Sequence, residues 1–145
     1  MKLAKIIAGA LVVFVVGVAL LWQRSDDRLV GEYVPDVPST YPEWNRQLGF
    51  AEETVEGALH HVFNSQPMVF TGNKIQFSTT NGVVTRRMLI LWKSRNATLV
   101  GYSLSSLYRL EYAPDGLWVR QQRIFGLPKI VLPIKMTKVI QEPDG

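Results

Sequence analysis

Two carboxylates and an imidazole follow one another at helical spacing near the middle of the chain. Glu52, Glu56 and His60 are each four residues apart, so a helix would align them along one edge. Such a column suits a divalent metal ion or acid–base catalysis. On a regular helix, however, His61 points about 100° away from His60. A polar border between a buried face and a solvent face explains the same residues, so we expect no metal ion here.

Motifs for covalent or phosphate chemistry are missing from the sequence. The eleven glycines form neither a G-x-G-x-x-G pattern nor a Walker loop, and there is no HExxH motif. The chain has no cysteine, which excludes disulfides, thiolate metal sites and a lipid-attachment cysteine. We therefore predict a protein that is not an enzyme and carries no cofactor.

The charges divide the chain into two halves of opposite sign. Residues 25–67 carry about −6 and residues 68–140 about +9. The two halves either pack together and neutralise each other, or the basic half binds an anionic ligand or an acidic partner. Lysine on edge strands also protects a sheet against aggregation. The candidate residues for partner or anion binding are Arg86, Arg87, Arg109, Arg120, Arg123, Lys135 and Lys138.

The N-terminal segment reads as a retained signal anchor, residues 1–24. An uncharged apolar run extends from Ile6 to Trp22, which is long enough to span a membrane with interfacial anchoring. It is longer than a typical cleaved signal peptide. Lys2 and Lys5 precede the run, so the positive-inside rule keeps the N-terminus cytoplasmic. We expect a bacterial inner-membrane protein whose domain lies in the periplasm, away from nucleic acid.

Helical signals follow a linker or edge segment at residues 25–40. That segment contains a possible short strand at 30–34. A capping box, Thr40–Glu43, then predicts a helix that runs to about Gln47. The apolar stripe of residues 51–64 predicts a second helix.

From residue 68 onward the pattern favours strands. Asn81-Gly82 lies between two β-rich runs and predicts a type I′ hairpin. Pro133 restricts the last strand to an edge. The sequence therefore predicts one α+β domain, residues 41–140, with one or two helices on an antiparallel meander of four to six strands. A partly rolled sheet, lipocalin-like or cystatin-like, is the alternative, and residues 141–145 are expected to be a flexible tail.

An anchor followed by a short α+β domain resembles, in architecture, the membrane-anchored periplasmic immunity proteins of the colicin-M type. The resemblance covers the anchor and the order of elements, and no residues are carried over from it. It implies a non-enzymatic binding or inhibitor module, for example a bacteriocin immunity protein. The alternatives are an accessory or assembly subunit of an envelope complex and a lipocalin-like domain that binds a small ligand or lipid.

Overall fold

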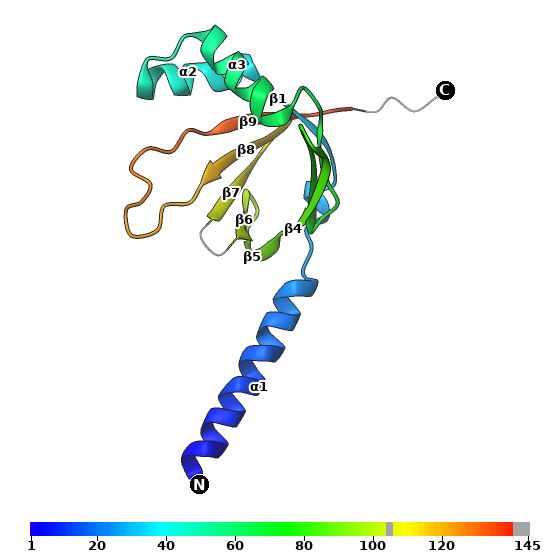
Figure 1. The fold of residues 1–145 in the computed structure, drawn as a ribbon, viewed down its shortest axis with the longest axis vertical. Helices are drawn as coiled ribbons and strands as arrows, with labels where there is room; N and C mark the ends of the chain where they lie inside the picture. Colours follow the sequence, from blue (N-terminus) through cyan, green and yellow to red (C-terminus); the bar gives the residue numbers. More distant parts are fainter. Residues whose placement is uncertain (104–105, 141–145) are drawn as a thin grey trace, which may run out of the picture.

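The apolar N-terminal run forms one long helix, α1 (Lys2–Gln23), which stands apart from the rest of the chain in the computed structural model (Figure 1). The structure describes residues 1–103 and 106–140, so the tail predicted at 141–145 lies outside it. No residue of α1 is buried. Its 22 residues span about 33 Å, close to the hydrocarbon core of about 30 Å. By length and composition, α1 can cross a membrane.

The domain that follows is built on a nine-stranded sheet in which every pairing is antiparallel. The order across the sheet is β4-β3-β2-β1-β9-β8-β7-β6-β5. The α+β class is confirmed, with more strands than the four to six expected. The strands are β1 (Gly31–Pro35), β2 (Met68–Phe70), β3 (Lys74–Thr79), β4 (Gly82–Arg87), β5 (Leu89–Lys93), β6 (Ala97–Ser103), β7 (Ser106–Ala113), β8 (Gly116–Gln121) and β9 (Ile134–Lys138).

The sheet curls until its two edge strands meet, so that the domain is nearly a barrel (Figure 1). β4 and β5 are consecutive in the chain and separated only by Met88. The stretch 82–93 therefore changes partner at Met88, pairing with β3 before it and with β6 after it. This arrangement matches the rolled-sheet alternative, because closure leaves few exposed strand edges.

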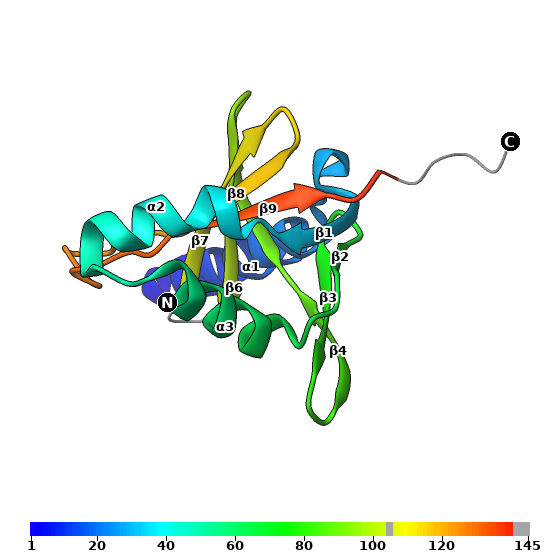
Figure 2. The same ribbon diagram turned by 90° about the horizontal axis from the view of Figure 1, so that it is seen from above.

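Two helices cover the side of the barrel opposite α1 (Figures 1 and 2). They are α2 (Val37–Leu48) and α3 (Glu52–Phe63). The α3 boundaries agree with the prediction, whereas α2 begins earlier than expected, because Asp36 rather than Thr40 caps it. The hydroxyl group of Thr40 is buried and accepts a hydrogen bond from the Lys135 amide at 2.9 Å.

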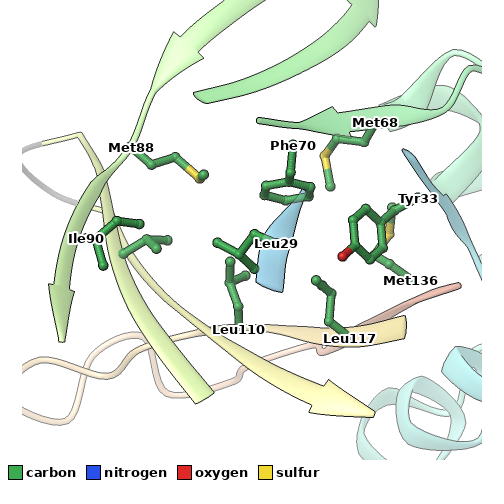
Figure 3. Packing of buried hydrophobic residues seen from close by; sticks show 10 residues of the cluster. Leu29, Tyr33, Met68, Phe70, Met88, Ile90, Leu110, Leu117 and Met136 are labelled. Atoms are coloured by element: carbon green, nitrogen blue, oxygen red, sulfur yellow. The ribbon is translucent and has the colours of Figure 1, made fainter. Parts of the chain in front are cut away.

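Side chains from nearly every strand form a core inside the barrel (Figure 3). Leu29 enters it from a short 3-10 helix, Asp27–Leu29, that connects α1 to β1. Tyr33 and Phe70 meet edge to face there, with ring centroids 5.3 Å apart. Residues 25–40, expected to be a linker or edge segment, thus contribute a core residue, a central strand and the start of α2.

Two local predictions about strands differ from the structure. β9 lies between β1 and β8 rather than at an edge, because Pro133 immediately precedes its first residue and removes no hydrogen bond from the ladder. The β3–β4 hairpin pairs Thr79 with Gly82, so its two-residue loop is Thr80–Asn81, one position earlier than expected. The Thr79 hydroxyl group donates to the Gly82 carbonyl oxygen at 3.0 Å across this turn.

Candidate functional site

The barrel contains an apolar cavity of about 280 Å³. It lies towards the end of the barrel formed by the β3–β4 turn and the last turn of α3, which we call the open end. The chain of α3 reaches it through Val62 and Phe63. Apolar and aromatic side chains line the cavity, and the Tyr102 and Tyr108 rings meet edge to face on one wall, 6.4 Å apart. The other lining residues are Met68, Phe70, Ile75, Phe77, Met88, Val100, Leu110, Val119 and Ile134.

The cavity follows from how the strands alternate. In a rolled sheet every second residue points inward, and β3, β6, β7 and β8 place apolar and aromatic residues at these inward positions. Met68 and Met88 have flexible side chains that adapt to different shapes of bound molecule. Such a space admits the apolar part of a ligand and offers it few polar contacts.

The opposite end of the barrel, which we call the closed end, is filled by a polar cluster. Asp26 is 3% exposed and accepts hydrogen bonds on its Oδ2 from the hydroxyl groups of Thr98, at 2.6 Å, and Tyr112, at 2.8 Å. Arg28 donates to both carboxylate oxygens, at 3.0 and 2.9 Å. The Arg28 guanidinium group also lies over the Tyr112 ring, 4.5 Å from its centroid.

The cluster holds Asp26 in its ionised form. Burial acts to raise the pKa of the Asp26 carboxyl group, but the hydrogen bonds from Arg28, Thr98 and Tyr112 outweigh it. The pKa of Asp26 therefore lies well below its usual range. Burial is the main cause that raises the pKa of the Tyr112 hydroxyl group to about 12. The cluster is thus a satisfied structural network rather than an acid–base pair.

Hydrogen bonds to backbone carbonyl oxygens tie the closed end to neighbouring turns. The Asp26 amide donates to the Gly72 carbonyl oxygen at 2.9 Å, in the β2–β3 turn. Arg28 Nη1 donates to the Ser94 carbonyl oxygen at 2.6 Å, in the β5–β6 turn. The segment that follows α1 therefore closes this end of the barrel.

Basic side chains also join α1 to the barrel. Arg87 Nη2 donates to the Trp22 carbonyl oxygen at 2.7 Å, and its guanidinium group lies 4.7 Å from the Trp22 ring centroid. Lys93 donates to the Ser25 carbonyl oxygen at 2.8 Å, and Arg24 donates to the Leu91 carbonyl oxygen at 3.2 Å. These contacts fix the direction in which α1 leaves the domain.

The predicted basic residues do not gather into one surface. Arg109 and Arg120 lie on either side of Glu111, with nitrogen–oxygen distances of 3.6 and 3.1 Å. Lys135 is buried and donates to Asp115 Oδ1 at 2.6 Å, an ion pair that lowers the pKa of Asp115. The remaining candidates are exposed or partly exposed at separate places, namely Arg86 and Arg87 on β4, Arg123 in the β8–β9 loop and Lys138 on β9.

Among these basic residues, Arg86 lies closest to the cavity in the sheet register. It pairs with Ile75, whose side chain lines the cavity, and residues directly opposite in an antiparallel pair point to the same face. Arg86 nevertheless remains exposed. Its guanidinium group is therefore on the cavity side of β4 and in contact with water.

The column predicted on α3 lies at the surface. Glu52, Glu56 and His60 are all exposed, and the Ser65 hydroxyl group lies 2.6 Å from His60 Nδ1. Across residues 1–103 and 106–140, no group of three or more metal-binding side chains comes together. The border between core and solvent accounts for this column, since Val55 and Leu59 of the same helix are buried.

Neither the cavity nor the polar cluster was recognised from the sequence. Asp26 and Thr98 are 72 residues apart, and no local pattern pairs them. The available signal in the sequence was a run of three charged residues, Asp26 to Arg28, directly before the apolar Leu29. Comparison of the chain with protein-family models, with curated proteins and with solved structures gave no match.

Proposed function

We propose that this protein is a membrane-anchored, non-enzymatic binding protein whose barrel takes up the hydrocarbon chain of a lipid-like ligand. The cavity of about 280 Å³ carries the proposal. Protein interiors contain few voids larger than a water molecule, and ligand sites are concave, mostly apolar and about 300–1,000 Å³ in volume. The cavity lies just below this range. Its apolar lining, closed off at one end of the barrel, suits a flexible hydrocarbon chain.

The ligand's polar group is best explained as an anion. Arg86 lies on the cavity side of β4, at the end of that strand away from the β3–β4 turn, and is exposed. A headgroup that emerges from the cavity beside this part of β4 would meet its guanidinium group. Arginine binds carboxylates and phosphates through paired hydrogen bonds. A fatty acid or an anionic lipid, with its chain inside and its headgroup beside Arg86, satisfies both features.

An anchor has a physical purpose in such a protein. Lipids with long chains reside in membranes, and a tether raises the effective concentration of the barrel at that surface. We propose that α1 is retained in a bacterial inner membrane with Lys2 and Lys5 on the cytoplasmic side. Protease added to intact spheroplasts should then degrade the barrel, and protection of the barrel would contradict this orientation.

The ligand proposal is tested by photo-crosslinking in a membrane. The full chain is placed in nanodiscs of phosphatidylethanolamine and phosphatidylglycerol, and palmitate with a diazirine in its chain is added and irradiated. Crosslinks should map by mass spectrometry to β3, β6 and β7, and unlabelled palmitate should compete them away. Crosslinks confined to α1 would show that the chain contacts palmitate only as a bilayer component, and the proposal would fail.

The inhibitor module and the envelope assembly subunit stay predictions from the sequence. Both need an outer surface for a protein partner. The basic residues expected to form that surface are dispersed, and three of them, Arg109, Arg120 and Lys135, are paired with acidic residues. A chain that purifies with a stoichiometric protein partner, and takes up no palmitate, would favour these functions over lipid binding.

A further inference from the structure

The β8–β9 loop, residues 122–133, exposes an unusual number of large apolar side chains. Ile124, Phe125, Leu127 and Ile130 are 40%, 101%, 62% and 52% exposed. An isolated exposed apolar residue needs no explanation, whereas a cluster at a loop tip marks an interaction site.

The loop is ordered by its own hydrogen bonds. The backbone groups of Ile124 and Leu127 bond to each other in both directions, at 2.9 and 3.1 Å, and form a tight turn. Arg123 closes the loop by donating to the Lys129 carbonyl oxygen at 2.7 Å. Phe125 occupies the tip with a φ of +53°, which is unfavourable for a bulky side chain. The turn therefore holds a phenylalanine outward without packing it against the domain.

Charge around the loop has a single sign. Arg123 and Lys129 flank the apolar tip, and the sequence has no acidic residue between Asp115 and Glu142. An apolar tip with basic flanks is the composition of segments that insert into the interface of an anionic membrane.

The loop also lies where a membrane around α1 would meet it. α1 leaves the barrel obliquely and leans towards the side on which the β8–β9 loop hangs (Figure 1). Seen from above, the N-terminal end of α1 lies on that same side of the molecule (Figure 2). A plane drawn across α1 near Trp22 therefore runs towards the loop. Arg87 and Lys93 hold α1 in this direction through their contacts with Trp22 and Ser25.

We infer that the β8–β9 loop is a second membrane contact, which inserts Phe125 and its apolar neighbours into the outer surface of the bilayer that holds α1. Arg123 and Lys129 would then lie among the lipid phosphates. This inference rests on the proposed membrane anchor but is independent of the ligand. A second attachment would limit the tilt of α1 in the membrane, and with it the tilt of the barrel that Arg87 and Lys93 join to α1.

The test uses the absence of cysteine, which permits labelling at one chosen site. Leu127→Cys and Leu48→Cys are each introduced into the full chain and labelled with an environment-sensitive fluorophore. Leu48 is a matched control, since it is an exposed leucine on α2, on the side of the barrel away from α1 (Figure 1). The chains are reconstituted into vesicles of phosphatidylethanolamine and phosphatidylglycerol.

The label at Leu127 should emit at shorter wavelength than the label at Leu48, and nitroxide-bearing lipids should quench it several-fold more strongly. Adding Phe125→Asp should abolish that difference while the chain still floats with the vesicles through α1. Equal quenching at the two sites would overturn the inference. A blue-shifted label at Leu127 that lipids do not quench would also overturn it, and would indicate contact with protein.

The three proposals fail separately in these experiments. Loss of flotation would reject the anchor and the loop contact together. Flotation with an unquenched label at Leu127 would reject the loop contact alone. Crosslinking of palmitate to β3, β6 and β7 decides the ligand proposal in either case.

Discussion

At the closed end of the barrel a buried carboxylate and its three donors fill the interior, whereas at the open end apolar side chains surround a cavity. The two ends share the same strands: β6, for example, begins beside the Asp26 cluster at Thr98 and ends at the cavity wall at Tyr102. The difference lies in which groups point inward. Directional hydrogen bonds fix one end in a single arrangement, and non-directional apolar contacts leave the other able to accept a flexible chain.

The comparison predicts that the closed end carries more of the stability. Asp26→Ala should lower the free energy of unfolding by about 2 kcal/mol. The hydroxyl groups of the buried Thr98 and the half-buried Tyr112 lose their shared acceptor and keep the hydrogen bond to each other, and the one donor left without a partner costs about 1–3 kcal/mol. Arg28 is partly exposed and can be rehydrated, so its charge adds little. The measurement is urea denaturation of the full chain in detergent, followed by near-ultraviolet circular dichroism.

Asp27→Ala is the matched control for this change. Asp27 is the exposed neighbour of Asp26 and should alter the free energy of unfolding by less than about 0.5 kcal/mol. If both variants lose the same stability, the cluster is not what holds the closed end.

Acid should weaken the same end through Asp26. The pKa of Asp26 is lower in the folded than in the unfolded protein, so its contribution is complete above the unfolded value of about 3.9 and declines as the pH falls below it. Between about pH 5 and pH 2 the free energy of unfolding should therefore fall less steeply in Asp26→Asn than in the unaltered protein. Asp115→Asn controls for the other carboxyl group with a lowered pKa. An unchanged pH dependence in Asp26→Asn would contradict the assignment.

How much of this comparison the sequence could predict depends on how local each feature is. The boundaries of α3 follow from an apolar stripe and its flanking residues, and the sequence predicted them. Closure of the barrel depends on pairings such as Tyr33 with Lys138, which link distant parts of the chain and leave no periodic signal. The cavity is harder still to predict from the sequence. Its volume is the difference between the space that the rolled sheet encloses and the volume of the side chains that point into it.

A substitution in the cavity should affect ligand uptake more than it affects stability. Val119→Trp places a large ring in the cavity and should weaken competition by unlabelled palmitate about tenfold, which corresponds to about 1.4 kcal/mol. The free energy of unfolding should change much less than in Asp26→Ala, since the ring fills existing space. Val83→Trp makes the same change on an exposed position of β4 and should leave competition unaltered. If the two substitutions weaken the competition equally, the cavity is not the place where palmitate binds.

The smallest effect is expected from the exposed charge of Arg86 on the cavity side of β4. Arg86→Gln should weaken crosslinking of photoreactive palmitate by about two- to fivefold, because an exposed ion pair is worth about 0.2–1 kcal/mol, and should leave the corresponding fatty alcohol unaffected. Arg95→Gln removes an exposed arginine from the β5–β6 turn, at the closed end, and tests whether net charge alone matters. If both substitutions weaken palmitate equally, the protein's overall field attracts the anion. If only Arg86→Gln does so, the headgroup lies beside Arg86, and the two arginines have different roles: Arg28 satisfies a buried carboxylate of the protein, and Arg86 is left in water for a carboxylate that arrives with the ligand.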